Sequence, residues 1–288
     1  ASFDILFKFA ATTTPTIMKL IAIMGFLVLT LSPRSYAWDL NIECGGRTNS
    51  LGKCSVALSD FWSLHNNPAG FASHQDFSFG IAYENRFLLK ELGNKDAGLL
   101  IPIKHGTLGI SFSQFGYEHY SENLLGLGLS KSFDNKLRVG LKLYYLLIRF
   151  SGDYQDRSIP TFDIGLQYQI NESLCLGAYI FNPINIKINS LNKDKIPIIM
   201  RFGFSYYVID DFMICSEIEE NLETDFSFRF GLEYEIYNNI YLRSGFQFRS
   251  ELFTFGIGYN YKWFMVDMSA QMNQDLGPSL SCSMIFKI

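Results

Sequence analysis

The protein has 288 residues, of which 48% are hydrophobic, 16% aromatic and 18% charged, and its formal net charge is −4 at pH 7. The aromatic content excludes a disordered chain, and the negative charge gives no basis for binding nucleic acid. The charged fraction is below the roughly 25% typical of soluble domains, so something other than water must accept part of the apolar surface.

Residues 1–37 have the features of a targeting signal rather than of a folded domain. A short basic segment at Met18 precedes an apolar run over 20–31, and small residues follow as far as Ala37. These are the parts of a secretory signal peptide, and the run is shorter than the roughly 20 residues of a membrane-spanning helix. We expect upstream residues before Met18, cleavage after Ala37 and a mature chain that starts near Trp38; a helical anchor is the less favoured alternative.

Residues 38–75 form a distinct segment before the repetitive part of the sequence. Ser55–Leu64 (SVALSDFWSL) is compatible with a short amphipathic helix, which the Asn-Asn-Pro-Ala-Gly string at 66–70 would end before the first strand. Cys44 and Cys54 are close enough in sequence for a local disulfide, although free thiols are the favoured alternative. The other three cysteines lie in strand-like segments, where a buried or lipid-facing thiol is expected.

From residue 76 to residue 288 the hydrophobic pattern has a period of two. In 136–150, for example, Leu141, Leu143 and Tyr145 alternate with Gly140 and Lys142. Such alternation sends successive side chains to opposite faces of a sheet. It predicts fourteen strands, near 76–89, 95–104, 106–117, 122–133, 136–150, 160–170, 173–182, 198–208, 211–220, 226–236, 239–249, 252–261, 263–272 and 278–288.

The lengths of these strands and of their connections favour a closed barrel over a soluble sandwich. Soluble strands average about 5–6 residues, whereas a tilted strand that crosses a bilayer needs about 9–11. Connections after even-numbered strands are short turns such as Asp134-Asn135, and the two longest connections, 151–159 and 183–197, follow odd-numbered strands. Bacterial outer-membrane barrels have this asymmetry, and closure pairs every main-chain group that faces lipid. We therefore predict an all-β, closed antiparallel transmembrane barrel in the outer membrane, with lipid around it.

Charged residues inside the strands must face the lumen, because on the lipid face each costs about 2–4 kcal/mol at the midplane. A packed ion-pair network that holds a narrow barrel and its plug is favoured over a polar conduit, since both signs of charge are mixed. The candidate lumen-lining residues are Arg138, Lys142, Asp163, Gln167, Arg201, Arg229, Glu233, Glu235, Arg243, Gln247 and Asp267.

The most specific string of the sequence is CGGRTNSLGKCSVALSDFWSLHNNPAGFA at 44–72. It resembles the N-terminal block of the FadL-like outer-membrane family, in particular its PorV/PorQ branch, in which a similar block precedes fourteen strands. The resemblance implies that this segment forms a plug, or hatch, in the barrel. It assigns plug positions to Gly46, Arg47, Gly52, Asp60, Asn67, Pro68, Ala69 and Gly70. Whether the plug is a gate or a fixed cork stays open.

Patterns of enzymes and of bound cofactors or metals are weak or missing in the sequence. The Gly46–Cys54 segment departs in spacing and in its last residue from a phosphate-binding loop. The four histidines show no spacing typical of a metal site. His119 and Ser121 are neighbours, but one such pair is common by chance. We therefore predict a protein that is not an enzyme and that has no cofactor, no metal and no nucleic-acid partner.

Two functions are consistent with the sequence. The first is passive transport of small hydrophobic compounds across the outer membrane, in which the N-terminal segment acts as the plug. The alternative, implied by the PorV/PorQ resemblance, is a non-catalytic role in type IX protein secretion or surface attachment, with secretion-system proteins as partners. A transporter needs an apolar path through the lumen, whereas a docking protein needs exposed outer loops.

Overall fold

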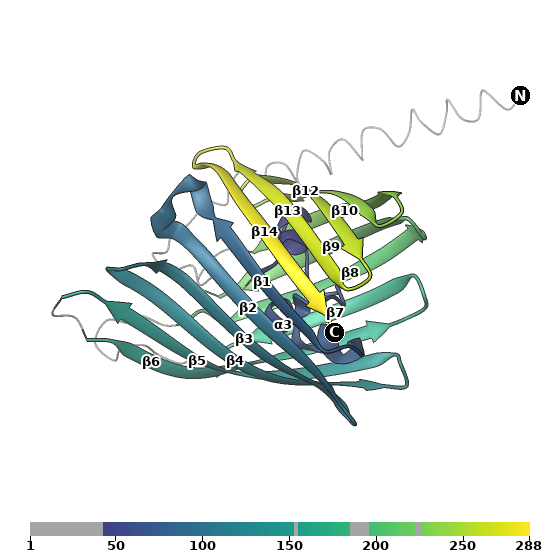
Figure 1. The fold of residues 1–288 in the computed structure, drawn as a ribbon, viewed down its shortest axis with the longest axis horizontal. Coiled ribbons are helices and arrows are strands. Elements are labelled where there is room, and N and C mark those ends of the chain that lie inside the picture. Colours follow the sequence, from purple (N-terminus) through teal and green to yellow (C-terminus); the bar gives the residue numbers. More distant parts are fainter. Residues whose placement is uncertain (1–42, 153–154, 185–195, 223–225) are drawn as a thin grey trace, which may run out of the picture. The chain divides into compact units, whose positions relative to one another are not determined.

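The computed structural model describes residues 43–152, 155–184, 196–222 and 226–288, which form a closed antiparallel β-barrel of fourteen strands with an N-terminal segment inside it (Figure 1). The predicted fold class is confirmed. The predicted signal peptide at 1–37 and the mature start near Trp38 lie outside the described residues. No helix within the described ranges is long and apolar enough to cross a membrane.

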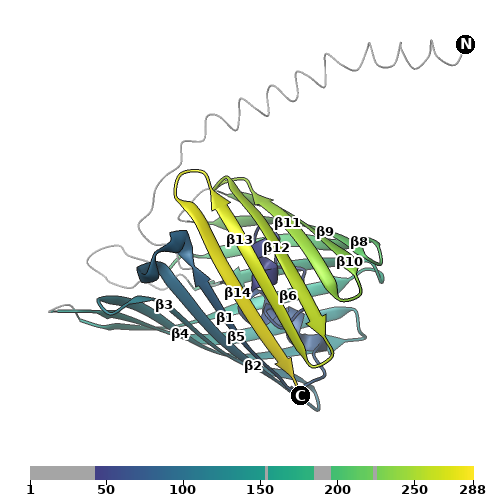
Figure 2. The ribbon, with the colours of Figure 1, turned by 45° about the horizontal axis from the view of Figure 1, so that its top comes forward.

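Each strand pairs with its neighbours in the sequence, and the barrel closes where β1 pairs with β14. In Figure 2 the last strand, in yellow, accordingly lies beside the first, in blue. The strands are β1 Ser78–Asn85, β2 Gly93–Ile103, β3 Gly106–Tyr117, β4 Tyr120–Phe133, β5 Leu137–Phe150, β6 Arg157–Gln169, β7 Leu174–Phe181, β8 Ile199–Ile209, β9 Phe212–Asn221, β10 Ser227–Tyr237, β11 Ile240–Gln247, β12 Leu252–Tyr261, β13 Phe264–Asn273 and β14 Gly277–Lys287.

The alternating pattern has the consequence that the sequence predicts. Along β5, Leu141 and Leu143 are exposed on the outer face at 46% and 56%, whereas Lys142 and Tyr144 between them are buried in the lumen. The outer face is therefore a surface of Leu, Ile, Phe and Tyr side chains with no second layer over it. A closed sheet tolerates such a surface because it leaves no unpaired edge.

The two ends of the barrel differ, and we call them the turn end and the loop end. The turn end carries the connections after even-numbered strands, for example 104–105, 210–211 and 238–239. Asp134 and Asn135 adopt left-handed backbone angles there (φ 50° and 54°), as tight hairpin turns require. The loop end carries the longer connections, which include 151–156 and 182–198.

The N-terminal segment consists of short helical pieces rather than the expected helix over 55–64. Those pieces are α2 Gly46–Ser50, α3 Ser63–Asn66 and the 3-10 helix η1 Pro68–Ser73. Residues 55–62 form turns and irregular backbone. The Asn-Asn-Pro-Ala-Gly string does end a helix, the short α3, and it then starts η1, where the Asn67 side chain accepts a hydrogen bond from the Ala69 N–H at 3.1 Å. The helix prediction was wrong because the barrel wall, not a helix, satisfies the main-chain groups of this stretch.

Inward-facing glycines leave the space that the plug occupies. A Cβ atom at Gly140 would lie 2.2 Å from the Pro68 carbonyl carbon, and one at Gly177 would lie 2.2 Å from the Val56 carbonyl oxygen. Many of these glycines are cross-strand partners, so they create flat patches of bare backbone. The glycine pairs between neighbouring strands are Gly80/Gly98, Gly109/Gly128, Gly140/Gly165, Gly177/Gly203 and Gly231/Gly245.

Candidate functional site

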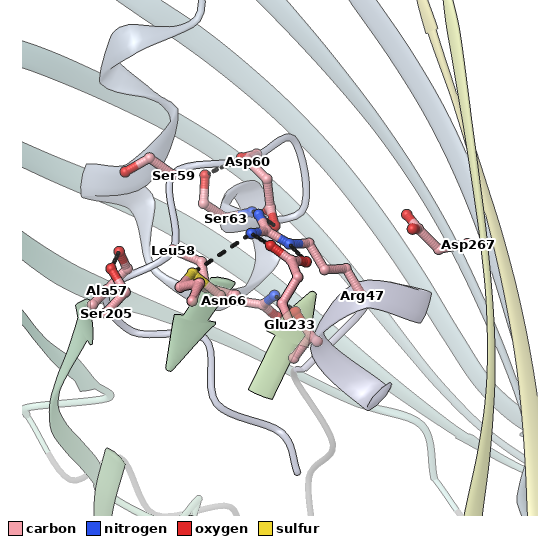
Figure 3. Close-up of polar contacts among 12 residues, drawn as sticks. Arg47, Ala57, Leu58, Ser59, Asp60, Ser63, Asn66, Ser205, Glu233 and Asp267 are labelled. Atoms are coloured by element: carbon pink, nitrogen blue, oxygen red, sulfur yellow. Dashed lines mark hydrogen bonds and ion pairs between the residues drawn. The ribbon is translucent and has the colours of Figure 1, made fainter. Parts of the chain in front are cut away.

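The candidate functional site is the contact between the plug, residues 43–77, and the lumen wall. Arg47 on α2 joins the two (Figure 3). Its guanidinium donates two hydrogen bonds to the Glu233 carboxylate of β10, at 2.8 and 2.6 Å, and forms an ion pair with Asp60 of the plug at 3.1 Å. Such two-pronged pairing fixes orientation as well as charge.

The chain of ion pairs continues along the wall. Arg243 of β11 contacts Glu233 at 2.5 Å and Asp267 of β13 at 2.6 Å. Glu233 and Arg243 lie on adjacent strands, whereas Arg243 reaches Asp267 across β12, and each of the three side chains is almost fully buried. Cationic and anionic side chains therefore alternate along the wall, and the guanidinium of the plug residue Arg47 has a fixed place in that pattern.

A second group of ion pairs surrounds Glu43 at the start of the described plug. Arg229 of β10 contacts Glu43 and pairs with Glu217 at 2.9 Å, while Arg201 of β8 pairs with Glu43 at 3.0 Å and with Glu219 at 2.6 Å. Burial alone raises the pKa of Glu43, but Arg201, Arg229 and Lys53 outweigh it and lower that pKa to about 2. Glu43 is therefore ionised at neutral pH. We call the two groups together the ion-pair lattice.

The wall also satisfies the main chain of the plug. The Glu217 carboxylate accepts hydrogen bonds from the N–H groups of Ser55 and Val56, both at 2.8 Å. The Gln167 side-chain amide donates to the carbonyls of Val56 and Leu58 at 3.1 and 2.8 Å. Buried main-chain groups need such partners, and here side chains of the barrel replace helical hydrogen bonds.

The predicted plug residues contact the barrel wall or other parts of the plug. Gly46 donates its N–H to Ser283, and Gly52, with φ of +63°, donates to Thr254 at 2.8 Å. The Asn67 side chain donates to the Val56 carbonyl at 2.6 Å. Pro68, Ala69 and Gly70 lie in η1, which packs against β4, β5 and β6.

The predicted lumen residues fall into two sets. Arg201, Arg229, Glu233, Arg243 and Asp267 join the lattice. The others have separate partners. Arg138 contacts Ser59 and Gln167, Lys142 donates to the Leu64 carbonyl, Asp163 accepts from Tyr144 and Tyr179, Gln247 donates to Ser227, and the half-buried Glu235 accepts from the Asn239 N–H near a turn.

Sequence reasoning missed three acidic members of the lattice, Glu43, Glu217 and Glu219. Glu217 and Glu219 follow Met213 and Cys215 at every second position of β9, so the alternation that selected Arg229 and Glu233 would have selected them too. Glu43 has no such signal, because it precedes the motif at 44–72.

The loop-end half of the lumen contains a group of buried apolar side chains between β4 and β8. Leu146, Phe181 and Ile196 have no exposed surface, and Ile148, Ile159 and Ile199 pack with them. The plug contributes Val56 and Ala57 to this group, which we call the apolar cluster. It borders the lattice, which joins β8 to β13, where Arg201 lies over the Tyr179 ring.

Pockets in the described part of the chain border the plug. One, of about 350 Å3, is lined by residues that include Arg47, Ser59, Arg138, Ser205 and Tyr207. Another, of about 400 Å3, is lined by η1 and by the turn between β2 and β3. Both reach turn-end residues and both are more polar than the apolar cluster.

The cysteines in the described residues are free thiols, so the local disulfide between Cys44 and Cys54 is not formed. The two residues belong to different packing groups: Cys44 packs with Trp62 and Leu64, whereas Cys54 packs with Leu51 and Cys215. Proximity in the sequence does not bring them together, because α2 separates them along the wall.

Comparison with known structures gives the same fold at low sequence identity. The CymD monoaromatic hydrocarbon channel has a TM-score of 0.66 at 13% identity, over 87% of this chain and 99% of that chain. The Pseudomonas putida toluene transporter TodX has a TM-score of 0.62 at 11% identity, over 88% and 99%. A Pseudomonas aeruginosa FadL homologue has a TM-score of 0.57 at 10% identity, over 83% and 96%. No protein-family model and no curated protein matches the sequence.

Proposed function

We propose that this protein is an outer-membrane barrel for the passive transport of small hydrophobic compounds, with residues 43–77 as a movable plug. The observation that carries the proposal is a closed barrel with an apolar outer face whose lumen is filled by a short N-terminal segment. The similarity in fold to the CymD monoaromatic hydrocarbon channel and to the toluene transporter TodX supports it. The proposal assigns no catalytic residue, cofactor or nucleic acid.

The apolar cluster supports a hydrophobic cargo. Its aliphatic and aromatic side chains line the loop end of the lumen, where a compound from outside would arrive first. The polar groups of the lumen do not oppose such a cargo, because the lattice pairs them with each other and with the plug. Apolar lining with a few placed polar groups is the usual composition of small-molecule sites.

The way the plug is attached supports movement rather than a permanent seal. Directed polar contacts hold residues 43–55 to β8–β13, whereas η1 rests on bare glycine backbone of β5 and β6. Displacement of η1 would therefore break fewer polar contacts than displacement of α2. We expect compounds to pass between η1 and the β4–β6 wall.

A disulfide that locks the plug to the wall tests the proposal. The Ser130 hydroxyl of β4 donates to the Ala69 carbonyl of η1 at 3.4 Å, so Ala69→Cys with Ser130→Cys joins η1 to the wall from which it would have to separate. The parent protein and the two single variants, Ala69→Cys and Ser130→Cys, are the controls. The readout is uptake of radiolabelled toluene, at low concentration, by a Gram-negative host that lacks such a channel.

The expected result is uptake by the parent, by both single variants and by the reduced double variant, and loss of uptake by the double variant after oxidation. Mass spectrometry confirms the crosslink in the oxidised sample. Uptake that persists with a complete crosslink contradicts a movable plug. No uptake by the parent contradicts hydrophobic transport altogether. Co-purification with secretion-system proteins from native membranes would then favour the PorV/PorQ-like alternative.

A further inference from the structure

We propose that Cys44, His65 and Asp96 form a binding site for a divalent transition metal of the zinc class, which fastens the plug to the barrel wall. The Sγ atom of Cys44, one ring nitrogen of His65 and one carboxylate oxygen of Asp96 all lie within 4.8 Å of one another. Cys44 precedes α2, His65 lies in α3 and Asp96 lies in β2, so the fold and not the sequence spacing brings them together.

The His65 side chain is the observation that points to a ligand. It is only 3% exposed, and neither ring nitrogen has a hydrogen-bond partner of normal geometry. A buried polar group without a partner is destabilising, and an imidazole carries two such atoms. A metal on one nitrogen removes half of that cost, and the nearby main-chain carbonyl of Phe112 is a suitable acceptor for the other N–H.

The donor set fits a borderline metal ion. Zinc is bound by thiolate sulfur, imidazole nitrogen and carboxylate oxygen at about 2.0–2.3 Å, which places the donors of a tetrahedral site roughly 3.3–3.8 Å apart. The three donors here must therefore approach by only about 1 Å, which side-chain rotation supplies. A thiolate and a carboxylate also neutralise a divalent ion, as is required among the apolar side chains of Phe61, Trp62 and Leu64.

The surrounding contacts hold two of the ligands in place. The Asn66 side chain accepts from the Cys44 N–H at 2.9 Å and donates to the Cys44 carbonyl at 3.0 Å. The Asn94 side chain donates to the Asp96 carboxylate at 2.7 Å. Outer contacts of this type orient metal ligands. The space beside Cys44, Asp96 and Glu84 is too small for a water molecule, so a fourth ligand would have to come from the side chains around the site.

The proton balance of binding is simple. Without metal, the Cys44 thiol hydrogen-bonds the Asp96 carboxyl. When the ion binds, the S–H bond breaks, the sulfur–metal bond forms, and the thiol proton leaves to solvent. The positive charge of Lys142 would repel the ion. The negative charge of Glu84 acts on Cys44 in the opposite direction and offsets it.

A second acidic group does not make a comparable site. Glu43, Glu217 and Glu219 also lie within reach of one another, but Arg201 and Arg229 neutralise them in the lattice. The Cys44–His65–Asp96 site differs because neither ring nitrogen of its imidazole has a hydrogen-bond partner of normal geometry. This inference does not depend on which compound, if any, passes through the barrel.

The test uses Co2+ as a spectroscopic probe on the purified, reduced barrel, added either to the folded protein or during refolding. We expect one Co2+ per chain, thiolate-to-cobalt absorption in the near ultraviolet, and displacement by Zn2+. Cys44→Ser should abolish the thiolate absorption. His65→Gln and Asp96→Asn should each weaken Co2+ binding by about 100-fold or more. Cys54→Ser and His74→Gln, which change plug residues outside the site, should leave binding unchanged.

A variant in which the other four cysteines are serine covers the case in which ligand variants fail to fold. It keeps Cys44, so retained thiolate absorption assigns the metal to this residue, and loss of that absorption overturns the proposal. Absence of Co2+ binding by the parent, or equal loss in the Cys54→Ser and His74→Gln controls, also overturns it. Zinc should raise the unfolding temperature of the parent but not of a folded His65→Gln variant.

Discussion

The two sides of the lumen are built on different principles. Between β8 and β13 the lattice fixes the plug through charged groups with directed hydrogen bonds, and Arg47, Arg229 and Arg243 each contact more than one partner. Between β4 and β8, at the loop end, the apolar cluster is held mainly by packing, with Val56 and Ala57 as its members from the plug. A uniformly polar lumen would be expected to exclude hydrophobic compounds. In this lumen, however, the polar groups of the lattice bind the plug and one another.

Arg229→Met should have the largest effect on stability, because it leaves Glu43, Glu217 and Glu219 buried with too few cations. Breaking a buried ion pair costs about 3–5 kcal/mol. The free energy of unfolding of the barrel in urea measures this loss of stability. Arg138→Met, which removes a partly exposed cation from the same lumen, is the control and should cost less than about 1 kcal/mol. Equal effects of the two substitutions would contradict the special role of the lattice.

Acidification should have the second-largest effect, which is a weaker attachment of the plug to the wall. Because the folded-state pKa of Glu43 is about 2 against an ordinary 4.5, its stabilisation is complete above pH 4.5 and is lost as the pH falls toward 2. The shift corresponds to about 3 kcal/mol. Fluorescence of the buried Trp62, with Trp38 and Trp263 changed to Phe, follows the plug. Glu43→Gln should flatten the profile in this window; an unchanged profile would show that another carboxylate governs it.

Leu146→Ala should lower the stability of the apolar cluster without releasing the plug from the lattice. Leu146 has no exposed surface, and removal of such a side chain costs about 2–4 kcal/mol through lost burial and a cavity. We expect lower stability in urea but unchanged Trp62 fluorescence at neutral pH. The outward-facing Leu143→Ala is the matched control and should cost less. If Leu146→Ala releases the plug, the two sides of the lumen are not independent.

Gly140→Ala should have the smallest effect, a loss of about 1–3 kcal/mol in the free energy of unfolding. The added Cβ would lie 2.2 Å from the Pro68 main chain and would overpack the contact between β5 and η1. We expect faster proteolysis of the plug in the folded barrel. Leu141→Ala, one position along on the outer face, is the control and should not change the cleavage rate. A plug that stays protected in Gly140→Ala would show that η1 shifts without loosening.

The sequence by itself determined the strands, their number and their direction, because alternation and turn residues are local properties of the chain. Predicted and observed strands coincide at 106–117 and at 252–261, and fourteen strands with short turns after the even-numbered ones can close without leaving an edge. The same alternation places Arg229, Glu233 and Lys142 in the lumen.

Only the tertiary structure decided which lumen side chains meet and how the plug folds. The partners of Arg47 lie 13 and 186 residues away along the chain, and no local pattern encodes the path of the plug that joins them. The stretch 55–62 has helical spacing of apolar residues, but Glu217 and Gln167 of the wall take its main-chain groups, so it forms turns. Cys44, His65 and Asp96 come together for the same reason: closure of the barrel around the plug sets distances that sequence separation does not contain.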